Sequence, residues 1–399
     1  MAHEQRAQER DAMITGIGLV SCLGATLEAH WEALNNPAGF TPVLDTDGFV
    51  PFAVHPMAPL DLDKQIPKRG DQRQMEPWQR IGTYAAGLAL DSAGAKGNAE
   101  LLTRMDMIVA AGGGERDAAV DATILSGYPK AANPGAFLNE HLVGDLRPTL
   151  FLAQLSNLLA GNISIVHGVI GSSRTFMGEE ACGADAVRIA CARIAAGQGD
   201  IALVGGSYNA ERPDVLMHYE MARLLRRAPF NGVRSRQKDG GGMILGSVGC
   251  FLVIESREHA ARRGATPFAH VAGIRTDRCR REPGQATANA QAQMEALRFE
   301  PTDGSAVISA ASGVAAPTLE EQAWLATLGL PVRAAATALG HGVEPSFVAA
   351  LALATLAVRH GALFGPLEAD EAPMTGPLRQ ALVTGWGHWR GEAMALVTP

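Results

Sequence analysis

The chain has 399 residues, of which 47% are hydrophobic and only 19% are charged. This composition supplies enough apolar surface for a large buried core and excludes a disordered or fibrous protein. The 34 basic and 41 acidic residues give a formal net charge of −7 without a basic block, which argues against a nucleic-acid partner. The longest apolar run, 347–358, is shorter than the about 20 residues that a membrane span needs. We therefore expect no membrane span.

The N-terminus and the cysteines indicate a cytoplasmic protein. Residues 1–12 are mostly charged or polar and contain no apolar signal core, so we expect a short disordered tail there. The five cysteines include no CxxC pair, and their odd number suits neither a disulfide framework nor a zinc site. These features predict free cysteines, no bound metal and a reducing compartment.

Short apolar segments punctuated by glycine and proline make up the first part of the chain. Residues 13–20 predict a buried strand. Residues 71–90 carry apolar side chains at helical spacing and predict a helix. The run 107–111 predicts a strand that opens into a glycine loop at 112–114, and residues 150–167 predict a long helix.

The next segment predicts a strand–turn–helix–strand unit. Residues 173–177 form the first strand, and a sharp turn follows at 178–180. Apolar residues at i, i+3, i+4 and i+7 then continue as a helix until Gly197 supplies a stop. A second buried strand covers 201–204. Such a unit presents a side chain from its turn at the N-terminus of the helix.

The last part of the chain continues the alternation of strands and helices. Residues 243–255 predict a strand pair or hairpin, and 346–359 predict a long apolar helix. Further short strands are expected at 306–310, 332–336 and 382–384. The pattern predicts a layered α/β protein. We expect two similar halves, residues 13–255 and residues 256–399.

Seven segments, in order and with plausible spacing, resemble the type II β-ketoacyl-acyl-carrier-protein synthases, which have the thiolase fold. They are ITGIGLVSCLG (14–24), DQRQMEPWQRIGTYAA (71–86), NLLAGNISIVHGVIGSSRTFMGEE (157–180), GQGDIALVGGS (197–207), DGGGMILGSVGCFLVIESREHAARRGA (239–265), GHGVEP (340–345) and VTGWGHWRGE (383–392). The resemblance covers nearly the whole chain. It implies a five-layer αβαβα fold with two pseudo-duplicated halves.

The nucleophile position departs from that family. The family uses a cysteine at a helix N-terminus, where the helix dipole lowers the thiol pKa, to accept an acyl group from the phosphopantetheine arm of a carrier protein. The gapless match into and out of the turn places Glu180 at this position. A carboxylate there cannot hold a thioester as a cysteine does. Cys182 could replace it only after a two-residue slip of the helix.

The histidine motifs are also altered. The segment that carries the family's first histidine has Ala311 or Ser312 in its place, and the position of the motif lysine holds Ala336. His341 matches the second histidine. Trp386 takes the place of the gating aromatic residue, whose backbone N–H lies at the oxyanion loop. His388, Trp389 and Arg390 put bulk where the family has small residues.

The resemblance therefore implies a catalytically degenerate relative, similar to the chain-length-factor partner subunits of polyketide and polyene systems. We expect it to pair with an active synthase or to form a homodimer, through the strand at 201–207. We also expect a Glu180–His341 contact. The alternatives are a malonyl-carrier-protein decarboxylase that uses Glu180 and His341, and a condensing enzyme that uses Cys182.

The expected partner is an acidic acyl carrier protein, whose phosphopantetheine arm carries the substrate; the chain is expected to have no cofactor of its own. A positive surface is needed to dock such a carrier. The main candidate is a basic cluster of Arg223, Arg226, Arg227, Arg234 and Arg236. A second candidate patch consists of Lys64, Lys68, Arg69 and Arg73.

Overall fold

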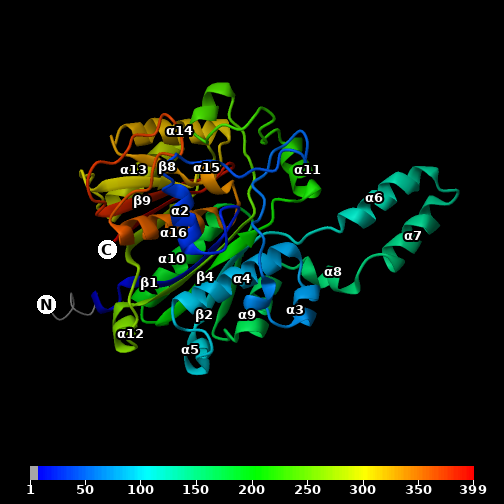
Figure 1. Cartoon of the computed structure of the whole chain (residues 1–399), viewed down its shortest axis with the longest axis horizontal. Helices are drawn as coiled ribbons and strands as arrows, with labels where there is room; N and C mark the ends of the chain where they lie inside the picture. The colour runs from blue at the N-terminus through cyan, green and yellow to red at the C-terminus, as the bar shows by residue number, and fades with distance from the viewer. Residues whose placement is uncertain (1–7) are drawn as a thin grey trace.

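The computed structural model describes residues 8–399, and these residues form one large mixed sheet covered by helices (Figure 1). The strands in chain order are β1 (Ala12–Val20), β2 (Asp106–Ala111), β3 (Ser173–Met177), β4 (Ile201–Tyr208), β5 (Val248–Ser256), β6 (Ala269–Asp277), β7 (Ser305–Ser309), β8 (Val332–Ala334), β9 (Gln380–Trp386) and β10 (Glu392–Thr398). Their order across the sheet is β3-β2-β4-β5-β1-β6-β10-β9-β7-β8.

Helices fill the connections between the strands. The α-helices are α2 (Leu27–Leu34), α3 (Arg69–Gln74), α4 (Pro77–Ser92), α5 (Ala99–Arg104), α6 (Ala118–Gly127), α7 (Pro134–Gly144), α8 (Pro148–Ala153), α9 (Leu158–His167), α10 (Ala181–Ala195), α11 (Pro213–Met221), α12 (Arg257–Arg262), α13 (Gln285–Leu297), α14 (Ala315–Ala326), α15 (Ala335–Leu339) and α16 (Ser346–His360). Short 3-10 turns cover Leu62–Lys64, Tyr128–Lys130 and Ser235–Asp239. Within residues 8–399, none of the helices combines the length and the hydropathy that crossing a bilayer requires.

The strand order repeats itself around the centre of the sheet. From β3 to β1 it runs β3-β2-β4-β5-β1, and from β8 to β6 it runs β8-β7-β9-β10-β6, so each strand of the first series has a counterpart in the second. The two series join through only three residue pairs between β1 and β6. The division of the chain near residue 256 stays a prediction, although β5 ends at Ser256.

Three apolar clusters produce the expected five layers. Helices α10 and α16 form the central layer, packed against strands of both series. Helices α4 and α9 cover the outer face of the first series, and α13 and α14 cover that of the second. Helix α16 is apolar all round because both of its sides face a sheet. The thiolase-like prediction is confirmed.

Several predicted elements differ from the structure in their details. The expected strand pair at 243–255 is wrong: this segment contains only β5, because Met243 and Leu245 make isolated bridges to neighbouring loops. The expected helix at 71–90 is two helices, α3 and α4, with Pro77 at the first position of α4. The expected helix at 150–167 is likewise split into α8 and α9. Of the predicted tail, residues 1–7 lie outside the described residues, and Ala12 already belongs to β1.

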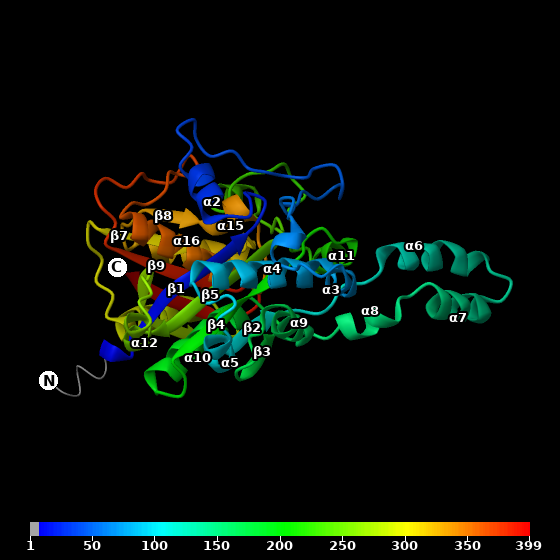
Figure 2. The ribbon, with the colours of Figure 1, turned by 60° about the horizontal axis from the view of Figure 1, so that its bottom comes forward.

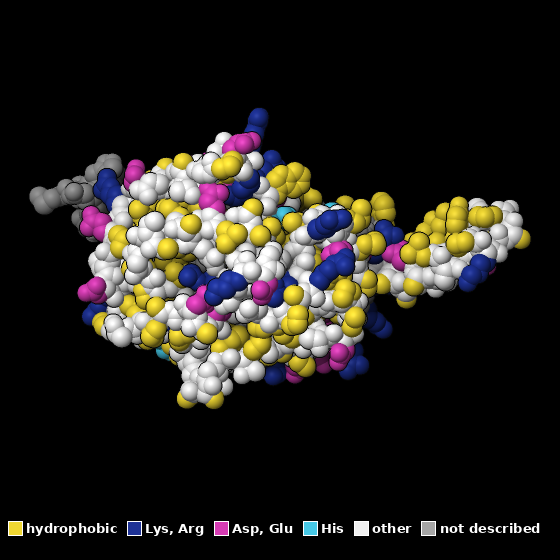
Figure 3. Space-filling model, turned by 90° about the horizontal axis from the view of Figure 1, so that it is seen from above, with side chains coloured by type: hydrophobic (Ala, Val, Ile, Leu, Met, Phe, Trp, Pro, Cys, Tyr) yellow, Lys and Arg dark blue, Asp and Glu magenta, His cyan; other side chains and the backbone are white. Residues whose placement is uncertain are grey.

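Residues 116–155 form a helical arm that the sequence analysis did not anticipate. Helices α6, α7 and α8 project away from the body of the molecule (Figures 1 and 2). Apolar side chains gather along the arm's surface (Figure 3). Its largest exposed apolar side chains are Leu125, Tyr128, Leu142, Val143, Phe151, Leu152 and Leu155. Exposed apolar side chains gathered in this way are a feature of protein interaction sites.

The two edge strands of the sheet differ in their exposure to solvent. Edge strand β3 is largely exposed, and Met177 at its end is 66% exposed. Edge strand β8 is fully buried. The expectation that the strand at 201–207 pairs with a partner subunit is wrong. Strand β4 lies inside the sheet and is hydrogen-bonded to β2 and β5 on its two sides, so it has no free edge. The free edge belongs to β3.

Candidate functional site

The site is built where the turn after β3 delivers Glu180 to the start of α10. Gly178 adopts a φ of 118°, which L-residues rarely adopt, and this conformation turns the chain sharply out of the strand. Glu180 is the N-cap residue of α10. Gly183 packs so closely on the backbone oxygen of Glu344 that a Cβ would collide with it. The absence of a side chain at Gly183 therefore lets α10 pack closely against the segment that precedes α16.

The Glu180 carboxylate is held between two histidines. Its Oε1 atom accepts hydrogen bonds from His341 Nε2 at 3.2 Å and from His388 Nδ1 at 2.6 Å, and also from the His388 backbone N–H at 3.0 Å. Burial by itself raises the pKa of this carboxyl, but the two histidines outweigh it and hold the pKa below its usual range. The geometry contains the expected Glu180–His341 contact.

His388 is a site residue that the sequence analysis did not identify. Burial lowers its pKa, but the hydrogen bond and charge of Glu180 raise the pKa above 6.5. The contact therefore favours the ionised form of Glu180 and the protonated form of His388. The signal was present in the sequence, because a histidine replaces a small residue in the loop opposite the nucleophile position.

The loop 387–391 is fastened over the end of α10. Arg390 Nε donates to Glu179 Oε1 at 2.8 Å, and an Arg281 nitrogen donates to the carbonyls of Gly387 at 2.6 Å and Gly391 at 3.2 Å. Gly391 lies so near Ala181 that a Cβ would collide with it. The bulky GHWRG segment thus closes the nucleophile position.

The other candidate residues have structural surroundings. Trp386 is buried with its ring 6.2 Å from that of Trp324, in the apolar cluster beneath α13 and α14. Its side chain also borders the small cavity beside Glu180, and its gating role stays a prediction. Cys182 is buried, and burial raises the pKa of its thiol well above the usual value. A thiol of this kind is a poor nucleophile.

Alanines fill the places of the family's remaining catalytic side chains. Ala311, which with Ser312 is one of the two residues expected at the first-histidine position, packs in one small apolar cluster with Ala336, which is expected at the motif-lysine position. Both alanines are therefore part of the buried core.

Glu344 is a second carboxyl that the sequence analysis missed. It is buried, its Oε2 atom has no hydrogen-bond partner among residues 8–399, and desolvation raises its pKa to about 7. Gly112, in the glycine loop after β2, lies directly against it. This loop therefore borders the site, and no sequence motif pointed to the acid beside it.

The proposed docking cluster is only partly on the surface. Arg226 and Arg236 are only 5% and 0% exposed, so including them in the docking cluster is wrong. Arg226 contacts Pro229 and Asp239, and Arg236 donates to the Ser312 carbonyl. Burial lowers the pKa of Arg236 to about 9. Arg234 is half-buried.

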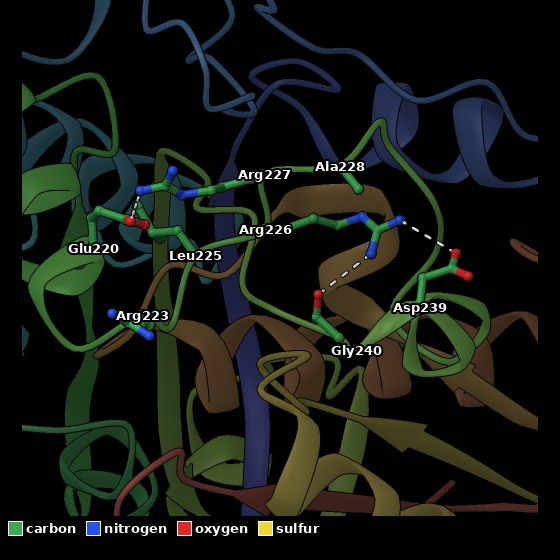
Figure 4. Close-up of a pocket in the computed structure, with 9 residues that line it drawn as sticks. Glu220, Arg223, Leu225, Arg226, Arg227, Ala228, Asp239 and Gly240 are labelled. Carbon is green, nitrogen blue, oxygen red and sulfur yellow. Dashed lines mark hydrogen bonds and ion pairs between the residues drawn. The ribbon is translucent and has the colours of Figure 1, made fainter.

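Arg223 and Arg227 are exposed and line a surface pocket of about 530 Å³ (Figure 4). Arg227 points toward Glu220 and pairs with it. Arg226 points the other way, toward Asp239 (Figure 4). The second patch, Lys64, Lys68, Arg69 and Arg73, is exposed throughout, beside and within α3.

Comparisons with known proteins agree with this architecture. Residues 9–260 match the family described as "Beta-ketoacyl synthase, N-terminal domain". The 3-oxoacyl-[acyl-carrier-protein] synthase 2 of Vibrio cholerae serotype O1 is 27% identical over 272 residues. That alignment covers 67% of this chain and 63% of the Vibrio protein, so the chain matches somewhat less than two thirds of this relative's length.

Two solved structures share the fold. One, entitled "The ishigamide ketosynthase/chain length factor", has a TM-score of 0.77 and 20% identity, with 98% of this chain and 99% of that chain covered. The other is a type II polyketide ketosynthase, AntDE, in complex with its acyl-carrier protein AntF. It has a TM-score of 0.74 and 18% identity, with 98% of this chain and 99% of that chain covered.

Proposed function

The chain belongs to the β-ketoacyl synthase family, and from that premise we propose that it is a non-condensing partner subunit of an active synthase in fatty-acid or polyketide synthesis. The observation that carries this proposal is the Glu180 carboxylate, clamped by His341 and His388 where the condensing nucleophile belongs. A carboxylate at this position cannot hold an acyl group as a stable thioester in the way that the condensing cysteine does.

The surroundings of Glu180 support the same conclusion. Ala311 and Ala336 provide no proton donor, and Cys182 is a buried thiol with a raised pKa. The condensing alternative through Cys182 has no accessible nucleophile. The decarboxylase alternative requires a malonyl carboxylate to enter beside Glu180, and two negative charges at that distance repel each other.

The exposed apolar arm and the free β3 edge supply a surface for the partner. An open strand edge pairs most readily with another strand, and a synthase of the same fold carries an equivalent β3. The arm's apolar side chains, such as Val143 and Phe151, would be buried by the same association. We propose a heterodimer with an intact synthase, in which this chain helps to set product length through the bulk of tunnel-lining side chains.

We further propose that the complex uses an acyl carrier protein and its phosphopantetheine arm. One structural neighbour is a ketosynthase bound to its carrier protein, and Arg223 and Arg227 provide an exposed positive surface here. All five cysteines are free, which supports a reducing, cytoplasmic location.

Co-expression with an intact Cys-His-His synthase tests the proposal. We expect a 1:1 complex by size exclusion with light scattering, condensation by the complex, and none by this chain alone. A synthase whose catalytic cysteine is replaced by alanine is the matched control: it should still form the complex but lose condensation. Condensation by this chain in the absence of any synthase would overturn the proposal.

A further inference from the structure

Ser346 forms a serine–histidine–carboxylate relay with two residues of the site. Ser346 Oγ lies 3.3 Å from His341 Nδ1, and His341 Nε2 lies 3.2 Å from Glu180 Oε1. The Gly342 N–H donates to the same Oγ at 2.9 Å, which leaves the hydroxyl proton free for the histidine. The order nucleophile, base, orienting acid is the arrangement that activates hydroxyl nucleophiles.

The charges in this relay fix its direction. An ionised Glu180 has no proton to give, so His341 donates from Nε2, and Nδ1 is left with a lone pair that accepts the Ser346 proton. Glu180 therefore orients the imidazole in the tautomer that a general base requires. Its second oxygen, Oε2, is buried without a hydrogen-bond partner among the described residues.

The position of Ser346 repeats that of the lost nucleophile. Helix α10 lies between β3 and β4, and α16 lies between their counterparts β8 and β9. Glu180 precedes the first residue of α10, and Ser346 is the first residue of α16. The first turn of a long helix leaves N–H groups without intrahelical acceptors, and these can stabilise an oxyanion.

Space beside Ser346 is small and apolar. It borders two cavities of about 10 Å³ each, roughly the room for one water molecule. One of them also touches Glu180 and the 387–391 loop, and the other is lined by alanines, including Ala310 and Ala336. The small volume of both cavities favours a short acyl group over a long one.

We propose that Ser346, His341 and Glu180 form a second catalytic site that hydrolyses short acyl thioesters; the choice of thioesters rests on the proposed function. Ser346 Oγ bonds to the acyl carbon, its proton passes to His341 Nδ1, and the carbon–sulfur bond breaks to release a thiol that takes that proton. Water then attacks the acyl-serine ester and gives its proton to His341. Ser346 regains a proton as the carboxylic acid leaves.

The test uses the full chain and acetyl-pantetheine, with thiol release as the rate and peptide mapping for the acetyl group. We expect thiol release above the buffer rate and acetyl on Ser346. Ser346→Ala and His341→Asn should each lower the rate at least about 100-fold. Cys182→Ala, which removes the nearby thiol but no member of the relay, should leave the rate unchanged.

Two further variants separate catalysis from folding. Ser346→Cys keeps a nucleophile in place and should accumulate an acetyl adduct at position 346 even where Ser346→Ala unfolds. Glu180→Gln tests the positioning role, because it should lower the rate and change its pH profile while the adduct stays on Ser346. Thiol release by Ser346→Ala at the wild-type rate, or none by the wild type, would overturn the proposal. Complex formation with a synthase, measured on the same samples, reports the partner role separately.

Discussion

The N-terminus of α10 and the arm of residues 116–155 differ in how far their side chains are covered by the rest of the described chain. At α10, the Glu180 carboxylate is buried and bonded to two histidines, and the loop 387–391 is fastened over it. On the arm, Phe151 and Val143 are 80% and 76% exposed, with no packing partner within residues 8–399 to cover them. One region is closed, and the other is open.

This difference supports the arm, and not the end of α10, as the region that carries the proposed partner role. A condensing site must admit an acyl chain and a malonyl unit, whereas the cavity beside Glu180 has room for about one water molecule. A large exposed apolar surface has a cost in water and persists where another protein covers it. The contrast supports the association that we propose for this chain, and each of the two regions can be tested by substitution.

The largest effect is expected from opening the closed region with Glu180→Ala. Removing the carboxylate leaves His388 buried without its partner, and breaking a buried pair in this way costs about 3–5 kcal/mol. The measurement is the free energy of unfolding in urea. Glu179→Ala is the matched control, because it breaks a pair with the half-exposed Arg390 and should cost less than about 1 kcal/mol. Equal losses for the two variants would contradict the clamp.

A charge placed on the open region should act on association alone. Replacing both Val143 and Phe151 by aspartate would bury charge in the complex, and we expect the affinity for the synthase to fall about 100-fold, or about 2.7 kcal/mol. Titration calorimetry gives the affinity. The free energy of unfolding of the isolated chain should not change. A variant that unfolds more easily but binds as well would show that the arm packs on its own chain.

The closed region should also show a specific pH dependence. The pKa of Glu180 is lowered, so its stabilising effect is full above pH 4.5 and is lost as the pH falls through the folded value. The pKa of His388 is raised, so its effect is full below pH 6.5 and is lost as the pH rises through the folded value. Wild type should therefore lose more stability than His388→Asn between neutral and alkaline pH. Parallel unfolding curves for the two proteins would refute this.

The smallest effect is expected at the arginine pocket. Arg223 is exposed, so Arg223→Ala should weaken the binding of an acyl carrier protein about two- to fivefold, with no loss of stability. Arg226→Met should lower the stability of the chain and leave carrier-protein binding unchanged, because the buried guanidinium holds Pro229 and Asp239 in place. Anisotropy of a labelled carrier protein and thermal unfolding measure the two effects. Equal changes in carrier binding and in stability for the two variants would contradict the assignment of a docking role to Arg223 and a structural role to Arg226.

The layered fold and the place of Glu180 at the start of α10 could be predicted from the amino-acid sequence. Apolar periodicity predicted β1, β2, β3, α10 and α16 within a few residues, because buried strands and helices have strict patterns. The gapless segment into the turn placed Glu180 at the start of α10. Strands β6 and β10 were not predicted, since β6 alternates only weakly and its burial comes from β10 and α13.

The contacts between distant side chains could be seen only in the folded structure. His388 and Ser346 are far from Glu180 in the chain, and they are brought together by the packing of α10 on α16 and by the loop after β9. The same holds for the arginines, because neighbours in sequence such as Arg226 and Arg227 point in opposite directions. Local patterns fix which face of an element is buried, whereas contacts between elements depend on how the whole sheet closes around its central helices.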